Sequence, residues 1–124
     1  MSERTILYIE DNEYNRKIVR QLLGRTSYQL VEAVDGESGV ALAQQLVPQL
    51  ILMDVQLPKM SGLDATRMLK ADPRTSGIPI IVITSFALSG DREKAAVAGA
   101  DNYLAKPYSP RELLALVRQY LPEA

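Results

Sequence analysis

The feature that most constrains this chain is an unbroken apolar run that leads directly into a carboxylate. Residues 50–53 are all apolar, Asp54 follows them, and Pro58 and Gly62 then break the chain. Such a run predicts a strand that is buried on both faces. Because an unpaired buried charge is costly, we expect Asp54 to lie where the strand ends and the chain meets water. An aspartate that merely caps a helix or forms a turn is the plainer alternative.

The rest of the chain alternates similar apolar runs with segments of helical periodicity. Strands that are separated by single helices run parallel, with right-handed crossovers and helices on both faces of the sheet. We therefore expect an α/β fold with five parallel strands and five helices. The expected strands are 5–9, 28–33, 49–53, 79–83 and 102–105, and the expected helices are 13–23, 37–47, 63–70, 91–98 and 110–121.

Composition excludes several classes of function. A length of 124 residues suits one domain, and a net charge of −1 gives no electrostatic case for binding nucleic acid or anionic lipid. The chain has no cysteine and no histidine, so any metal must be held by oxygen ligands. No apolar run is long enough to span a bilayer, and the N-terminus lacks the apolar region of a signal peptide. We therefore expect a cytoplasmic protein with no nucleic-acid or membrane partner.

Polar residues stand at four of the five expected strand ends. In a parallel sheet these ends share one edge, which is where open α/β folds bind ligands. Two carboxylates about 4 Å apart repel by roughly 4 kcal/mol at an effective dielectric of about 20, so such a cluster should hold a proton or a cation such as Mg²⁺. An ammonium and a hydroxyl beside a nucleophilic aspartate complete the groups that phosphoryl transfer needs. These residues are Glu10, Asp11, Asp54, Thr84 and Lys106.

Each of these residues also has an ordinary structural interpretation. Glu10 and Asp11 could cap the helix that follows them, Lys106 could be a solvated surface charge, and Thr84 could be a β-branched strand residue. Their coincidence at the strand ends favours a site for phosphate and metal.

The order of the motifs resembles the receiver domain of two-component response regulators, of the single-domain chemotaxis-receiver type. The motifs are Glu10-Asp11, Met53-Asp54, Leu57-Pro58-x-Met60-x-Gly62, Thr84-Ser85 and Lys106-Pro107. The resemblance implies a flavodoxin-like, doubly wound sheet with the strand order 2-1-3-4-5. It also implies one receiver domain over residues 1–124 with no output domain. The run Glu10-Asp11-Asn12-x-x-Asn15-Arg16 is similar to receivers found alone or attached to hybrid sensor kinases.

The resemblance implies a role for each residue of the site. Asp54 would accept a phosphoryl group from a phosphohistidine on a sensor histidine kinase or a histidine phosphotransfer protein. Asp11, Asp54 and the backbone carbonyl of Gln56 would ligate Mg²⁺ or Mn²⁺, and Glu10 would act through a water. Lys106 would pair with the phosphoryl oxygens. The absence of histidine from the chain is consistent with an external donor.

The resemblance also implies a switch. Thr84 would move toward the phosphoryl group, and Tyr103 would turn from solvent into the space that Thr84 vacates, although an ordinary edge-strand aromatic is the alternative. The Lys106–Pro107 peptide bond would be cis. The protein would catalyse only its own phosphorylation and dephosphorylation, and it would not be a turnover enzyme. Output to an unknown downstream protein would use the fourth helix, fifth strand and fifth helix, which carry Arg92, Lys94, Tyr103, Arg111 and Arg118.

Three other functions are compatible with such a chain. A phosphatase with an aspartate nucleophile needs a second carboxylate two residues later, and Gln56 stands there. A pseudo-receiver would bind partners without ever being phosphorylated, and the presence of all five key residues disfavours it. Flavin binding would need a phosphate-binding loop after the first strand, which is absent from the sequence.

Overall fold

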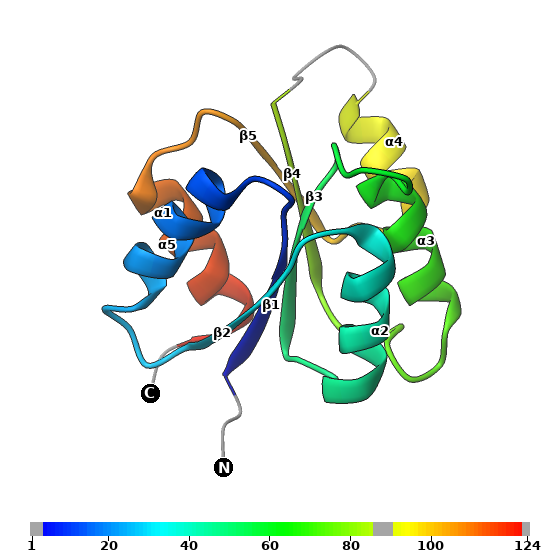
Figure 1. Ribbon diagram of the computed structural model, residues 1–124, viewed down its shortest axis with the longest axis horizontal. Coiled ribbons are helices and arrows are strands. Elements are labelled where there is room, and N and C mark those ends of the chain that lie inside the picture. The colour runs from blue at the N-terminus through cyan, green and yellow to red at the C-terminus, as the bar shows by residue number, and fades with distance from the viewer. Residues whose placement is uncertain (1–3, 86–90, 123–124) are drawn as a thin grey trace.

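The computed structural model describes residues 4–85 and 91–122, in which strands and helices alternate. The elements are β1 (Thr5–Ile9), α1 (Glu13–Leu23), β2 (Gln29–Ala33), α2 (Gly36–Leu46), β3 (Leu50–Asp54), α3 (Gly62–Ala71), β4 (Ile80–Thr84), α4 (Asp91–Ala98), β5 (Asn102–Ala105) and α5 (Pro110–Tyr120). The strands form one parallel sheet in the order β2-β1-β3-β4-β5. Helices α1 and α5 cover one face of the sheet, and α2, α3 and α4 cover the other (Figure 1). The predicted doubly wound α/β fold and its strand order are confirmed.

Side-chain alternation along the strands creates two separate cores. Every residue of β3 and β4 is buried, because these strands have neighbours on both sides and helices on both faces. Leu50 and Leu52 join the core beneath α1 and α5, whereas Ile51 and Met53 join the core beneath α2, α3 and α4. Each such side chain contributes about 1.5–3 kcal/mol on burial, so the strand ends are held by a rigid, two-sided core.

Two strands lie one residue later in the sequence than predicted. β3 includes Asp54, which pairs in register with Ile83 of β4. β4 includes Thr84, which pairs with Ala105 of β5. Both polar residues therefore belong to the sheet itself and not to the loops that follow it.

Among the described residues, polar side chains cap the N-termini of α1, α2, α3 and α5. Asn12, Asp35, Ser61 and Ser109 each accept a hydrogen bond from the backbone N–H three residues later. Ser109 and Glu112 form the predicted capping box at the start of α5. In the part of the chain described, no helix is both long and apolar enough to cross a bilayer.

Two apolar residues of α1 lie outside the core. Tyr14 and Ile18 have exposed fractions of 71% and 40%, although both follow helical spacing. Only a narrow stripe of the helix, including Val19 and Leu23, reaches the sheet and is buried. Tyr14 and Ile18 are instead available at the surface near the strand ends.

Candidate functional site

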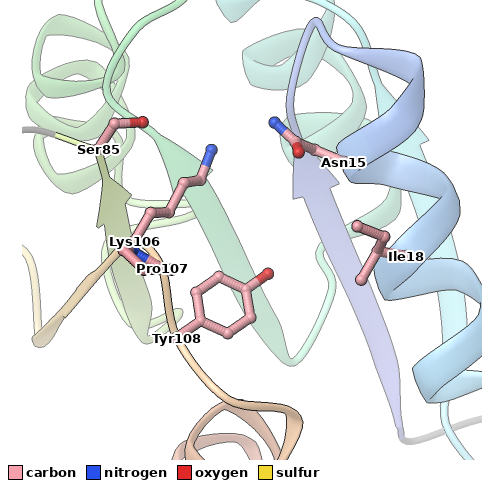
Figure 2. A pocket seen from close by; sticks show the side chains of 6 residues that line it. All are labelled: Asn15, Ile18, Ser85, Lys106, Pro107 and Tyr108. Atoms are coloured by element: carbon pink, nitrogen blue, oxygen red, sulfur yellow. The ribbon is translucent and has the colours of Figure 1, made fainter.

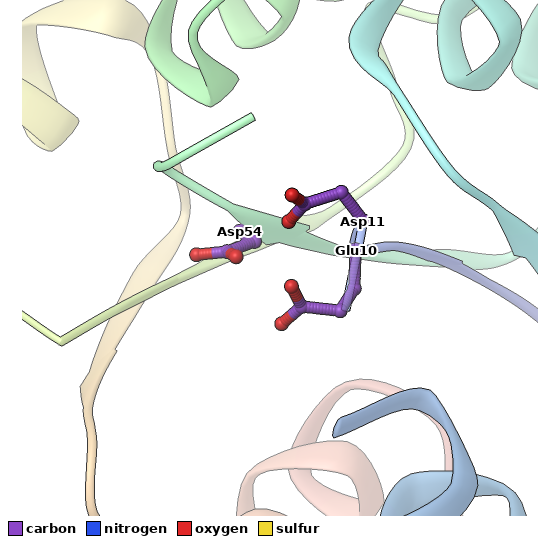
Figure 3. Close-up of side chains that lie close together, drawn as sticks. All are labelled: Glu10, Asp11 and Asp54. Carbon is purple, nitrogen blue, oxygen red and sulfur yellow. The ribbon is translucent and has the colours of Figure 1, made fainter. Parts of the chain in front are cut away.

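Neighbouring strands bring three carboxylates together at one edge of the sheet (Figure 3). Ile9 of β1 pairs with Met53 of β3, so the residues that follow them, Glu10 and Asp54, are also neighbours. One carboxylate oxygen from each of Glu10, Asp11 and Asp54 lies within 4.8 Å of the other two. A set of oxygen donors this close together fits a hard divalent cation such as Mg²⁺ or Mn²⁺.

Glu10 is the most enclosed of the three carboxylates, with 1% of its surface exposed. Its Oε1 accepts hydrogen bonds from Lys106 Nζ at 2.9 Å, Asn15 Nδ2 at 3.3 Å and the Tyr8 hydroxyl at 3.3 Å. Its Oε2 accepts one from the Asn12 N–H at 3.2 Å. Burial raises the pKa of Glu10, but its hydrogen bonds with the neighbouring carboxyl and with Lys106 outweigh burial and hold the pKa below its ordinary value. Glu10 therefore stays ionised at neutral pH.

Asp54 is also buried, with 4% exposed, and the expectation that it meets water at the strand end is wrong. Its Oδ1 accepts a hydrogen bond from the Gln56 N–H at 3.3 Å, and its Oδ2 lies 3.7 Å from Lys106 Nζ. These partners make burial tolerable. Burial raises the pKa of Asp54 to about 7, the hydrogen bond and charge of Glu10 act in the same direction, and Lys106 opposes them.

Asp11 gives the cluster its access to solvent. The carboxylates of Glu10 and Asp11 point to opposite sides of the end of β1, and Asp54 lies between and beside them (Figure 3). Asp11 is exposed, and partial burial and the hydrogen bond with Glu10 raise its pKa. A cation can therefore approach from the Asp11 side without opening the core.

Lys106 reaches the cluster from the loop after β5, 96 residues away from Glu10 in the sequence. Its ammonium is closer to Glu10, at 2.9 Å, than to Asp54, at 3.7 Å. The Lys106–Pro107 peptide bond is cis. One ammonium shared between two buried carboxylates offsets part of their repulsion.

Thr84 and Tyr103 face the core beneath α2, α3 and α4, on the opposite side of the sheet from α1 and α5. Thr84 is 1% exposed and lies two residues beyond Val82, which belongs to the core beneath α2, α3 and α4. Tyr103 pairs with Val82 across strands, is half-buried, and packs against the same core. The Arg92 guanidinium lies 4.9 Å from the centre of the Tyr103 ring, which is within the range of a cation–π contact.

A cavity of about 440 Å³ adjoins the cluster, between α1 and the loop after β5. Figure 2 shows the Lys106 ammonium and the Asn15 amide at one end of it, and Ile18 and the Tyr108 ring at the other. Ser85 and Pro107 complete the lining. The cavity therefore offers both apolar contact and polar groups next to Asp54.

Three residues contact Glu10 in ways that the sequence did not predict. Asn15 and Arg16 follow Glu10 in the first turns of α1; Asn15 bonds its carboxylate, and Arg16 Nη1 donates to its carbonyl at 2.9 Å. Tyr8 reaches it from inside β1. The only local signal for Tyr8 was a hydroxyl within an apolar strand, since buried tyrosines usually need a hydrogen-bond partner.

Comparison with known proteins identifies the family. The sequence model of the response regulator receiver domain matches residues 6–118. The chain belongs to the response regulator receiver family. It is 37% identical over 121 residues to the polar-differentiation response regulator DivK of Brucella anthropi, and the match covers 98% of both proteins.

Solved receiver domains share this fold and include metal-bound forms. The receiver domain of sensor histidine kinase PA1611 from Pseudomonas aeruginosa PAO1 is 35% identical, with a TM-score of 0.88 over 96% of this chain and 98% of that one. It was crystallised with a magnesium ion in its active-site cleft. The Mn²⁺-bound response regulator Rcp1 is 26% identical, with a TM-score of 0.80 over 94% of this chain and 90% of that one. This receiver carries an acidic cluster whose donors fit the same class of ion.

Proposed function

We propose that this receiver accepts a phosphoryl group on Asp54 from a phosphohistidine of a sensor histidine kinase or histidine phosphotransfer protein. The observation that carries the proposal is the packing of three carboxylates within 4.8 Å, with the Lys106 ammonium 3.7 Å from Asp54. Carboxylates this close together repel one another, and a bound cation would relieve that repulsion and, with the Lys106 ammonium, attract an anionic group such as phosphate. The partner kinase and the receiver would meet in the cytoplasm.

In the proposed reaction, a carboxylate oxygen of Asp54 attacks phosphorus as the bond from phosphorus to the histidine nitrogen breaks. The imidazole leaves with the electron pair of that bond. Asp54 must be ionised to attack, and its pKa of about 7 makes the reaction pH-dependent near neutrality. Asp11, Asp54 and the Gln56 carbonyl would hold Mg²⁺ or Mn²⁺ directly, with Glu10 acting through a water. The bound cation would supply charge neutralisation between carboxylates and phosphate.

The remaining site residues would stabilise and report the phosphoryl group. The Lys106 side chain would move so that its ammonium pairs with a phosphoryl oxygen in place of Glu10. The movement would be short, because the ammonium already lies close to both Glu10 and Asp54. The Thr84 hydroxyl would donate to another oxygen, and Tyr103, on the same face of the adjoining strand, would follow it inward. The protein would thus catalyse only its own phosphorylation and slow dephosphorylation.

Output would be a change at the surface formed by α4, β5 and α5. Arg92 and Tyr103 already contact each other there, so movement of the ring would release the guanidinium. A downstream protein would read the altered surface, which also carries Lys94, Arg111 and Arg118. In this proposal residues 1–124 act as one receiver unit.

The test is incubation with acetyl phosphate and Mg²⁺, followed by intact-mass measurement. We expect one added phosphoryl group on the wild type and none on Asp54→Asn. Asp64→Asn is the matched control, because Asp64 is an exposed aspartate that pairs only with Arg67 among the described residues. Full phosphorylation of Asp54→Asn would exclude Asp54 as acceptor, and an unmodified wild type would favour a pseudo-receiver.

A further inference from the structure

Tyr8 is a buried polar side chain that the proposed reaction does not use. It is the fourth of the five residues of β1, between Glu32 of β2 and Leu52 of β3, and has no exposed surface. The neighbouring residues of β1 are aliphatic, and any of them would fill this core without the cost of burying a hydroxyl. The contacts of the Tyr8 hydroxyl therefore indicate what this residue does at its buried position.

Strand geometry aims the Tyr8 ring at Glu10. Residues two apart in a strand share a face, so Tyr8 and Glu10 both point toward α1 and α5. The Tyr8 hydroxyl donates to Glu10 Oε1 at 3.3 Å. Burial, Tyr108 and the two nearby carboxylates raise the pKa of Tyr8, so its hydroxyl remains a proton donor.

Glu10 is thereby held from several directions at once. Tyr8 reaches Oε1 from within the sheet, Asn15 from α1 and Lys106 from the loop after β5. Of these donors, Tyr8 is the most firmly held, because its ring is packed inside a core cluster. Lys106 would leave Glu10 when a phosphoryl group arrives, so the Tyr8 hydroxyl would then become a larger part of what holds the carboxylate.

We propose that the Tyr8 hydroxyl is a positioning group for the divalent-cation site, acting through the carboxylate of Glu10. This inference rests on the proposed function, since it assumes that the carboxylate cluster binds a cation. Mg²⁺ requires near-ideal octahedral geometry, and the water through which Glu10 would act is one of the ligands of that octahedron. Groups that orient the residues around a metal typically change its affinity 10- to 100-fold when removed.

The test compares Tyr8→Phe with Tyr120→Phe by calorimetric titration with MgCl₂. Tyr120 is a suitable control because its hydroxyl also makes hydrogen bonds. It accepts one from the Asn102 side-chain amide and donates one to the Asp101 carbonyl, at the start of β5 and away from the carboxylates. We expect Tyr8→Phe to weaken Mg²⁺ binding about 10-fold and Tyr120→Phe to leave it unchanged. Melting curves without metal should show both variants folded.

A second variant separates positioning from packing. In a Glu10→Ala background, Tyr8→Phe should change the Mg²⁺ dissociation constant less than twofold, because the residue through which Tyr8 acts is gone. Two results would overturn the role of Tyr8 without affecting the cation site. One is an Mg²⁺ dissociation constant for Tyr8→Phe equal to that of the wild type, and the other is an equally large loss of Mg²⁺ affinity from Tyr8→Phe in the Glu10→Ala background. No saturable Mg²⁺ binding by the wild type would instead overturn the proposed function and this inference together.

Discussion

At the scale of single residues, the site shifts the pKa values of two neighbouring carboxyl groups, Glu10 and Asp54, in opposite directions. Glu10 has several hydrogen-bond donors and a lowered pKa, whereas Asp54 has fewer and a pKa raised to about 7. Both are buried, so local hydrogen bonding and not exposure decides which one holds a proton. Asp54, the proposed nucleophile, is thus the one of the two carboxyls that titrates near neutral pH.

Asp54→Asn should therefore stabilise the metal-free protein at alkaline pH. The folded pKa of about 7 exceeds the ordinary value of 3.8, so the stability that Asp54 contributes is present at low pH and is lost as pH rises through 7. Asparagine does not titrate, and we expect the variant to gain about 1–3 kcal/mol over wild type at pH 8 and less at pH 5. Urea unfolding in EDTA at both pH values measures this. A gain independent of pH would contradict it.

Lys106→Met should have the opposite effect. The substitution keeps the length of the side chain but leaves Glu10 and Asp54 without the ammonium that lies near both. Breaking a buried ion pair by removing one partner costs about 3–5 kcal/mol. We expect a loss of this order in urea unfolding at pH 8 without metal. Lys94→Met, at an exposed position on α4, is the matched control, and an equal loss there would refute the argument.

At the scale of elements, the turn from β3 into α3 places Asp54 through a close backbone contact. The Gly62 N–H donates to the Val55 carbonyl at 2.8 Å. A Cβ at Gly62 would overlap the Asp54 carbonyl oxygen and lie 2.8 Å from its carbonyl carbon. Because both contacts are with backbone, no side-chain rotation can relieve them. The start of α3 is thus packed directly against the main chain of Asp54.

Gly62→Ala should consequently be damaging, whereas Gly77→Ala should not. A Cβ at Gly77 meets nothing within 4 Å. We expect Gly62→Ala to lose about 2–4 kcal/mol of unfolding free energy and to weaken Mg²⁺ binding, and Gly77→Ala to stay within about 1 kcal/mol of wild type. Urea unfolding of the two variants side by side provides the comparison. Equal stability would mean that the turn can move without cost.

Most helices and strands could be predicted because the sequence patterns that indicate them are local. β1, α1, α4 and β5 have the predicted bounds, since the residue pattern that predicts each one lies within or next to its own segment. The grouping of Glu10, Asp11 and Asp54 followed from topology. The burial of Asp54 did not, because it depends on Lys106, whose position is set by contacts far along the chain. The role of Tyr8 was not predicted for a related reason, because its hydrogen bond with Glu10 depends on the position that the folded site gives to the Glu10 carboxylate.

At the scale of the whole molecule, folding itself concentrates negative charge at one edge. The parallel sheet orders β1 next to β3 and so forces their terminal carboxylates together. Hydrophobic burial in the two cores on either side of the sheet must offset this repulsion. A ligand that neutralises the edge should then stabilise every part of the fold cooperatively.

Mg²⁺ should accordingly raise the melting temperature of the wild type. Binding to the folded state alone stabilises by about 2.7 kcal/mol when the free ion is 100 times its dissociation constant. The shift should be larger at pH 8 than at pH 5.5, because the cation must displace the proton that Asp54 holds below pH 7. Differential scanning fluorimetry with and without MgCl₂ measures both shifts. Asp11→Asn should reduce the shift, and an unchanged response would remove Asp11 from the ligands.

The orientation of the chain has a practical corollary. β1 starts at Thr5 and α5 ends at Tyr120, and both points lie at the opposite edge of the sheet from the carboxylates (Figure 1). A fluorescent label or affinity tag attached next to Thr5 or Tyr120 would lie on the side of the molecule away from the carboxylates. Tags for capturing partner proteins can therefore be placed beside these two residues without blocking access to the carboxylate cluster.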